Sequence, residues 1–360
     1  MSWRERASRV GVIAPGEVGT RLPLLGDAHV HLGLTDPTLL LAGGLGRVQE
    51  LGWIPEVAAG WRTASLSGAA QSGVNPYPEI SIAGAFLTAV GGYPSDRSWA
   101  PEGAVREVHS VADAGIADAQ AAVAEQVAVG ASVIKVTLNS DAGPVFDDDT
   151  LAAIVESARD AELRIVAHVE GAGQCARAIA AHIEVLAHTP FTEAVSDALL
   201  EQAVAHGQQW MSTIDIHGYG APDARQAVSR GIALDNLRRF VALGGSVIYG
   251  TDLGNGKLPP GVNAREVRAL QDAGMSVDDV IVAMTTWWGA ASSGDSLVVD
   301  HSRGNGRVTF VPGPGVTDNF AGSVDFADWL THARVVNAEE LEPLEPLEHD
   351  DHDDRNLENV

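Results

Sequence analysis

The chain alternates short apolar runs with longer segments in which apolar residues recur at helical spacing. Eight apolar runs have the length of strands: 21–32, 48–51, 79–87, 131–138, 163–169, 183–188, 208–214 and 246–252. The helical pattern covers 117–130, 147–161, 173–182, 196–206, 233–243, 264–273 and 276–286. Strands that are apolar nearly throughout are typical of parallel sheets covered on both faces. Eight such units predict an α/β protein with a (β/α)8 TIM barrel.

A doubly wound open sheet is the alternative architecture for the same pattern. The chain has no G-x-G-x-x-G after its first apolar run and no Walker A motif, so nothing favours a nucleotide-binding fold. We therefore predict a barrel over residues 22–295.

The two chain ends differ from this central region. Residues 1–21 contain turn-forming Pro and Gly, and 296–338 hold three short β-like runs, SLVVDH, RVTFV and ARVV, which suit a small appended sheet. Residues 339–360 contain ten acidic residues and one arginine. This composition predicts a disordered tail that contributes nothing to the core.

Charge and cysteine content narrow the function classes. The chain has 23 Lys and Arg against 48 Asp and Glu, a formal net charge of −25. Such a chain repels phosphate backbones and anionic membranes, so we expect neither nucleic acid nor a membrane as partner. A single cysteine, no secretory signal and no apolar run of about 18 residues lead us to expect a cytoplasmic protein. A homo-oligomer remains possible.

Polar residues stand at the carboxyl ends of the predicted strands, where a parallel barrel has its active site. His29 and His31 are two apart on the first strand, so both imidazoles face the same side and form half of a metal site. Lys135 lies inside the apolar strand SVIKVTL, where a bare ammonium is costly to bury. Three further strands end in His168, His188 and Asp252.

In type and order, these six residues resemble the metal ligands of the amidohydrolase superfamily, a family of metal-dependent (β/α)8 barrels. The stretch from GASVIKVTL to IEVLAHTP and the segment YGTDLGN are similar to its imidazolonepropionase-like and Xaa-Pro dipeptidase-like branch. The resemblance covers roughly residues 22–290. Members of this branch carry a β-sandwich built from both chain ends, and only about 20 residues precede the first strand here. The sandwich is therefore expected to be reduced or absent.

The resemblance implies a binuclear metal centre. His29, His31 and Asp252 would hold one divalent ion, and His168 and His188 would hold the other. Lys135, carbamylated by carbon dioxide, would bridge the two ions. Zinc suits these ligands best, and manganese, cobalt and iron are chemically possible.

The activity implied is hydrolysis of an amide or related C–N bond in a small molecule, such as a cyclic amide, an N-acyl amino acid or a dipeptide-like compound. A metal-bridging hydroxide would attack the carbonyl, with Asp252 as the proton shuttle and catalytic residue.

Three other functions suit the same residues. A lactonase or esterase would use the same hydroxide. A mononuclear deaminase fits less well, because deaminases of this superfamily lack the strand-four lysine and carry a glutamate where Gly171 stands here. A non-catalytic metal-binding scaffold is the third.

Substrate contacts are expected from the loops that follow the strands. The candidates are Tyr93, Arg97 and Trp99 after the third strand, His217 and Tyr219 after the seventh, and Asn255 after the eighth.

Overall fold

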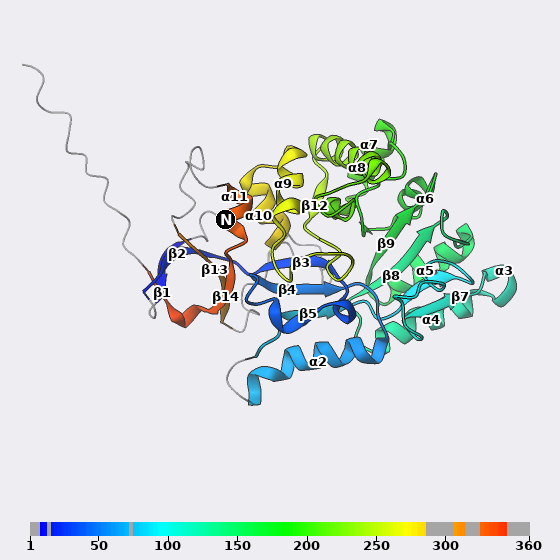
Figure 1. Ribbon diagram of the computed structural model, residues 1–360. Coiled ribbons are helices and arrows are strands. Elements are labelled where there is room, and N and C mark those ends of the chain that lie inside the picture. Colours follow the sequence, from blue (N-terminus) through cyan, green and yellow to red (C-terminus); the bar gives the residue numbers. More distant parts are fainter. Residues whose placement is uncertain (1–7, 13–15, 72–74, 286–305, 314–324, 344–360) are drawn as a thin grey trace, which may run out of the picture.

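The computed structural model describes residues 8–12, 16–71, 75–285, 306–313 and 325–343. Two parallel sheets form the main body (Figure 1). The first has the order β3-β4-β5, with β3 Leu25–Val30, β4 Leu45–Glu50 and β5 Glu79–Ile82. The second has the order β12-β11-β10-β9-β8-β6-β7, with β6 Phe86–Ala89, β7 Val105–Val108, β8 Val133–Asn139, β9 Arg164–Glu170, β10 Val185–Leu186, β11 Gln209–Met211 and β12 Ser246–Ile248. The α/β class and the parallel strands expected from the apolar runs are confirmed.

The expected third strand, 79–87, is two strands. Gly84 has φ +79 between β5 and β6, and a Cβ there would lie 2.2 Å from Oε1 of Gln126. That Oε1 accepts a hydrogen bond from the Ala85 N–H at 2.8 Å. The buried side-chain amide of Gln126 therefore holds the chain where it changes direction, and β6 pairs with β8 and β7 instead of with β4.

Backbone hydrogen bonds join the two sheets at both sides. The Ala28 N–H donates to Tyr249 O at 3.0 Å, and Leu253 N–H donates to His29 O at 3.1 Å. On the other side, Ser132 N–H donates to Ile82 O at 2.8 Å. The first and last strands of the main body thus lie side by side.

Helices surround these sheets (Figure 1). They are α2 Pro55–Gln71, α3 Val111–Ala114, α4 Ile116–Ala128, α5 Asp148–Asp160, α6 Gln174–Ala180, α7 Asp197–Ala205, α8 Ala224–Ala242, α9 Ala264–Asp272 and α10 Val277–Thr285. The expected cap of α5 is present, since Asp147 accepts from the Thr150 N–H. Three of these helices differ from expectation: α2 and α3 were not predicted, and α8 begins well before residue 233, at a capping box of Asp223 and Gln226. None of the helices in the described ranges combines the length and apolar character needed to cross a bilayer.

The chain ends form a third, antiparallel sheet at one end of the molecule (Figure 1). Its order is β14-β13-β2-β1-β15, with β1 Ser8–Val12, β2 Val18–Leu22, β13 Arg307–Pro312, β14 Arg334–Asn337 and β15 Leu341–Pro343. Helix α11 Phe326–Leu330 precedes β14. RVTFV and ARVV are strands as expected, whereas SLVVDH lies outside the described residues.

The terminal sheet is small but present. Two expectations for these ends need correction. Residues 8–12 and 18–22 are strands rather than only turns. The acidic segment is folded at its start, because residues 338–343 form the 3-10 helix η5 Ala338–Glu340 and then β15. Strand β15 pairs with β1, and Leu341 packs against the buried cluster of Val10, Val12 and Phe310. Pairing with a strand about 330 residues earlier in the chain is a long-range effect that composition does not reveal.

Truncation separates the two parts of the acidic segment. We expect deletion of residues 341–360 to lower the melting temperature by several degrees, because the terminal sheet loses an edge strand and an apolar contact. Deletion of 344–360 alone should change it by less, since that composition is too polar to build a core. Thermal unfolding of both variants measures the difference. Equal melting temperatures would show that β15 contributes nothing.

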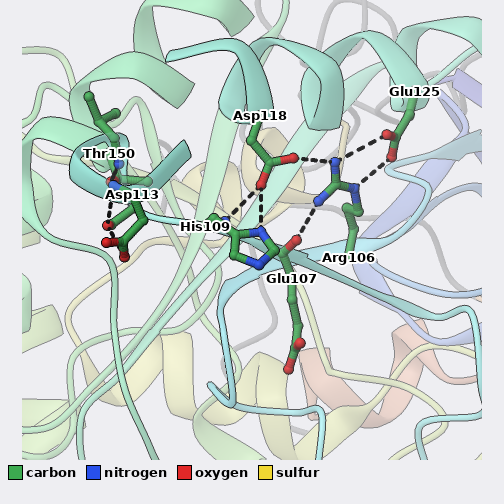
Figure 2. Close-up of polar contacts among 9 residues, drawn as sticks. Arg106, Glu107, His109, Asp113, Asp118, Glu125 and Thr150 are labelled. Atoms are coloured by element: carbon green, nitrogen blue, oxygen red, sulfur yellow. Dashed lines mark hydrogen bonds and ion pairs between the residues drawn. The ribbon is translucent and has the colours of Figure 1, made fainter. Parts of the chain in front are cut away.

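The extra strand β7 is held by a polar cluster (Figure 2). The guanidinium of Arg106 lies between two carboxylates of α4, at 2.7 Å from Asp118 and 2.9 Å from Glu125. Asp118 also accepts from the backbone N–H of His109 at 2.8 Å. Glu107, on the same strand, accepts from the Gly91 N–H at 2.8 Å. This cluster therefore anchors the start of the loop that carries Tyr93 and Trp99.

Candidate metal centre

The six strand-end residues expected from the sequence meet in one place. His29 lies on β3, Lys135 on β8 and His168 on β9. His31, His188 and Asp252 follow the ends of β3, β10 and β12 by one, two and four residues. All six line a single cavity of about 450 Å³: His29, His31, Lys135, His168, His188 and Asp252. Each is at most 8% exposed. The strands that deliver them are far apart in sequence, so their convergence is a property of the fold.

Three of the residues form a tight cluster. The Nε2 atoms of His29 and His31 lie 3.4 and 3.2 Å from Oδ1 of Asp252. One potential ligand atom from each residue lies within 4.8 Å of the others. Two imidazoles and a carboxylate at this spacing are a donor set that first-row divalent metals accept.

The hydrogen bonding of His29 suits a metal ligand. Its Nδ1 lies 2.8 Å from Ala187 O, and because a carbonyl only accepts, Nδ1 carries the proton. Nε2 is then left with a lone pair facing Asp252. Burial, with the nearby charges of Lys135 and His188, lowers the pKa of His29 well below its usual value. The imidazole is therefore neutral, as a metal ligand must be.

His168 and His188 extend the cluster on the other side. The His188 ring lies 4.7 Å from the ring of His29 and 4.9 Å from that of His168, measured between centroids. Nδ1 of His188 is 2.9 Å from Oγ1 of Thr213. Burial lowers the pKa of His188 well below its usual value, with the charge of His168 as the next cause. A second neutral imidazole therefore stands beside the first cluster.

Lys135 lies among these groups with 1% exposure. Within the described residues, no carboxylate approaches its ammonium closely enough for a salt bridge. Burial lowers the pKa of Lys135 to about 7, although the charges of Asp252 and Glu50 oppose this shift. Near neutral pH, Lys135 is therefore an unprotonated amine in a large fraction of the molecules.

The donor set fits a bound cation. Oε2 of the fully buried Glu50 and Nδ1 of His31 have no hydrogen-bond partner. Burial disfavours charge on His31, yet the nearby carboxylates of Asp252 and Glu50, at 3.2 and 3.8 Å from its ring nitrogens, outweigh it and raise the His31 pKa to about 9. The two carboxylates therefore favour positive charge at this point, which a divalent ion supplies more strongly than a proton.

The backbone around Asp252 is constrained. Asp252 has φ +60, a conformation that costs a non-glycine residue about 1 kcal/mol or more. Asn255 holds it with two hydrogen bonds: its N–H donates to Asp252 O at 3.1 Å, and its Nδ2 donates to Oδ1 at 2.9 Å. At Gly254, φ is +110 and a Cβ would lie 2.6 Å from His31 O, so only glycine fits. This segment packs directly against the strand end that carries His31.

Asp27 is a site residue that the sequence reasoning missed. It is fully buried, and its Oδ1 accepts from the backbone N–H of both His29 and Thr251, at 3.0 and 3.1 Å. The Thr251 hydroxyl donates to Oδ2 at 2.5 Å. One carboxylate thus ties the strand end that carries His29 to the residue before Asp252. An aspartate two residues before the H-x-H pair was the available signal.

Loss of this connection should loosen the metal site. We expect Asp27→Ala to weaken metal affinity by about 10–100-fold, the usual effect of removing a group that orients ligands. Metal titration of the metal-free protein checks this. Asp36→Ala is the matched control, because Asp36 is exposed and only caps the 3-10 helix η2 Pro37–Leu39. Equal affinity in both variants would show that Asp27 is not needed for ligand geometry.

Most of the expected substrate contacts line the same cavity: Tyr93, Trp99, His217, Tyr219 and Asn255. Arg97 is not among the lining residues, and its guanidinium lies over the Tyr93 ring at 5.5 Å. Sequence reasoning missed six lining residues: Phe86, Glu170, Phe191, Ile216, Gln226 and Gly256. Glu170 ends β9 and Phe191 follows β10, so position alone could have pointed to these two.

Comparison with known proteins identifies the family. Residues 22–296 match the profile of the amidohydrolase family. The chain belongs to the amidohydrolase family. The resemblance drawn from the six strand-end residues is thereby confirmed. The protein is a hydrolase of the amidohydrolase type.

Several solved structures share its fold. A Xaa-Pro dipeptidase with methionine in its active site is 20% identical, covering 90% of this chain and 86% of that one, with a TM-score of 0.66. A putative prolidase from Bifidobacterium longum is 18% identical over 89% of this chain and 80% of its own, with a TM-score of 0.66. Phenylurea hydrolase B is 15% identical over 88% and 84%, with a TM-score of 0.60. No curated protein sequence matches this chain.

Proposed function

We propose that the protein is a binuclear metal-dependent hydrolase that cleaves an amide or related C–N bond in a small molecule. The observation that carries this proposal is the convergence of four imidazoles, one carboxylate and one buried lysine on a single cavity. The hydrogen bonds between β3 and the segment after β12 support a closed (β/α)8 barrel as its frame.

In this proposal, two groups of ligands lie on either side of Lys135. His29, His31 and Asp252 would hold one ion, and His168 and His188 would hold the other. The unprotonated Lys135 amine adds to carbon dioxide, forms an N–C bond and releases one proton. The resulting carbamate would have two oxygens, so it could contact both ions, and it would replace an ammonium that the interior disfavours with an anion. The bound ions, with zinc as the first candidate, supply an activated water and polarise the carbonyl.

The chain's own residues handle the protons and the geometry. Asp252 accepts the proton of the attacking water at its free carboxylate oxygen and delivers it to the leaving nitrogen. Asn255 keeps this carboxylate oriented through its side-chain amide. The aromatic side chains around the cavity exclude bulk water, which strengthens these electrostatic effects.

Metal content tests the proposal. We expect purified protein to carry about two divalent ions per chain, measured by elemental analysis after extensive dialysis. The deletion of residues 344–360 is the matched control, because His349 and His352 lie there among aspartates that can bind ions adventitiously. One ion per chain in both forms would favour the mononuclear alternative, centred on His29, His31 and Asp252. None in the truncated form would overturn the metal centre.

A further inference from the structure

Aromatic rings form two walls of the cavity. The first wall is Phe86, Tyr93 and Trp99, with Trp99 at 5.8 Å from Phe86 and 6.2 Å from Tyr93 between ring centroids. The second wall is Phe191 and His217, whose rings are 4.6 Å apart.

Both walls contact the proposed metal ligands. In the first wall, Trp99 lies 6.1 Å from the His31 ring, and Tyr93 stacks on His168 at 5.0 Å. In the second, Phe191 lies 6.4 Å from His188. A group bound next to the ions therefore meets ring faces and edges. Planar aromatic groups pack well against such surfaces.

The charge of the cavity points to a neutral ligand. Among the described residues that line it, Lys135 is the only lysine or arginine, and the proposed function uses it between the ions. Glu170 adds a carboxylate to the wall. A free carboxylate on a substrate would thus lose its hydration without meeting a cationic side chain there, which is unfavourable.

Apart from Glu170, the titratable groups that line the cavity away from the six ligands are uncharged. Burial, with the charge of Arg230, lowers the pKa of His217 to about 4, so its imidazole is neutral. Burial, with the charges of Asp252 and Asp215, raises the pKa of Tyr219 to about 12. These side chains and Asn255 offer hydrogen bonds rather than counter-charges. Arg225 and Arg230, on α8, lie outside the lining residues.

We propose that the substrate is a neutral small molecule with a planar aromatic group next to the scissile C–N bond, and that the cavity disfavours substrates with a free carboxylate. This inference rests on the proposed function and specifies its substrate class. In the reaction, water gives its hydroxyl to the acyl carbon and a proton to the leaving nitrogen as the C–N bond breaks. The cavity volume of about 450 Å³ is large enough for a small molecule that carries one aromatic ring.

A matched pair of ligands tests the charge preference. 4-Acetamidobenzamide and 4-acetamidobenzoate have the same shape and differ by one negative charge. We expect the metal-loaded protein to bind the neutral compound about tenfold or more tightly in isothermal titration calorimetry. Equal affinities, tighter binding of the acid, or no measurable binding of either compound would overturn the proposal. If the acid binds better and Arg225→Gln removes that preference, α8 recognises carboxylates instead.

Wall variants test the aromatic preference. Trp99→Leu should weaken binding of 4-acetamidobenzamide by about tenfold, and Phe191→Leu should act in the same direction if the first variant does not fold. Trp61→Leu is the control, because Trp61 lies on α2 and packs near Trp53 rather than lining the cavity. Equal effects of Trp99→Leu and Trp61→Leu on binding would contradict the proposal that the aromatic wall binds the substrate.

Release of the aromatic amine, measured separately, distinguishes the two proposals. Tight, neutral-selective binding without amine release would uphold the substrate class and contradict the hydrolase proposal. Amine release that is faster from the acid would uphold the hydrolase and contradict the substrate class.

Discussion

Lys135→Ala should lose nearly all activity and at least one of about two bound ions, because the proposed bridge between the two groups of ligands would be lost. The chain has only two lysines, and this one is 1% exposed among the proposed ligands. Lys135→Arg should fail equally, since a guanidinium stays protonated and forms no carbamate. Turnover and metal content are measured together. Added bicarbonate or a short carboxylate should partly restore both in Lys135→Ala, by placing a free anion where the carbamate would stand.

Lys257→Ala is the matched control for this experiment. Lys257 is exposed and is not among the cavity residues, so its loss should leave turnover and metal content unchanged. Full activity in Lys135→Ala would contradict the carbamate bridge. Loss of activity with both ions retained and no anion rescue would assign Lys135 a role other than bridging.

Asp252→Asn should reduce amide hydrolysis by about 10²–10⁴-fold, the usual scale for losing general acid–base catalysis. An amine leaves poorly unless it is protonated, so amides depend strongly on the proton that Asp252 delivers. Asparagine keeps an oxygen that can face the metal, so metal content should survive in part. An activated aryl ester, whose leaving group needs no proton, should lose less activity. The measured quantity is the ratio of the amide loss to the ester loss.

The ratio of the amide loss to the ester loss distinguishes between the candidate reactions. Equal losses would assign Asp252 only to metal positioning. A greater loss on the ester would favour the lactonase or esterase alternative over C–N hydrolysis. Asp36→Asn, an exposed aspartate outside the cavity, provides the control and should leave both activities unchanged.

The sequence by itself determined the α/β class, most of the strands and the six residues of the candidate metal centre. This was possible because a buried parallel strand must be apolar along its length, so a histidine, lysine or aspartate on it stands out. The position of such a residue at the strand's carboxyl end then predicts at which end of the barrel it lies. Lys135 is the clearest case, since SVIKVTL has no other charged residue.

Only the tertiary structure decided the contacts between segments far apart in the chain. The division of residues 79–87 into two strands at Gly84 depends on a hydrogen bond from Ala85 to Gln126. The hydrogen bonds of Asp27 depend on Thr251, which is more than 200 residues away in the chain. The folding of Leu341 into the terminal sheet depends on β1. Local periodicity reports which face of an element is apolar but not which partner covers it. The packing of the strands decides which elements become neighbours. It therefore also sets the distances that bring six separate side chains into one site.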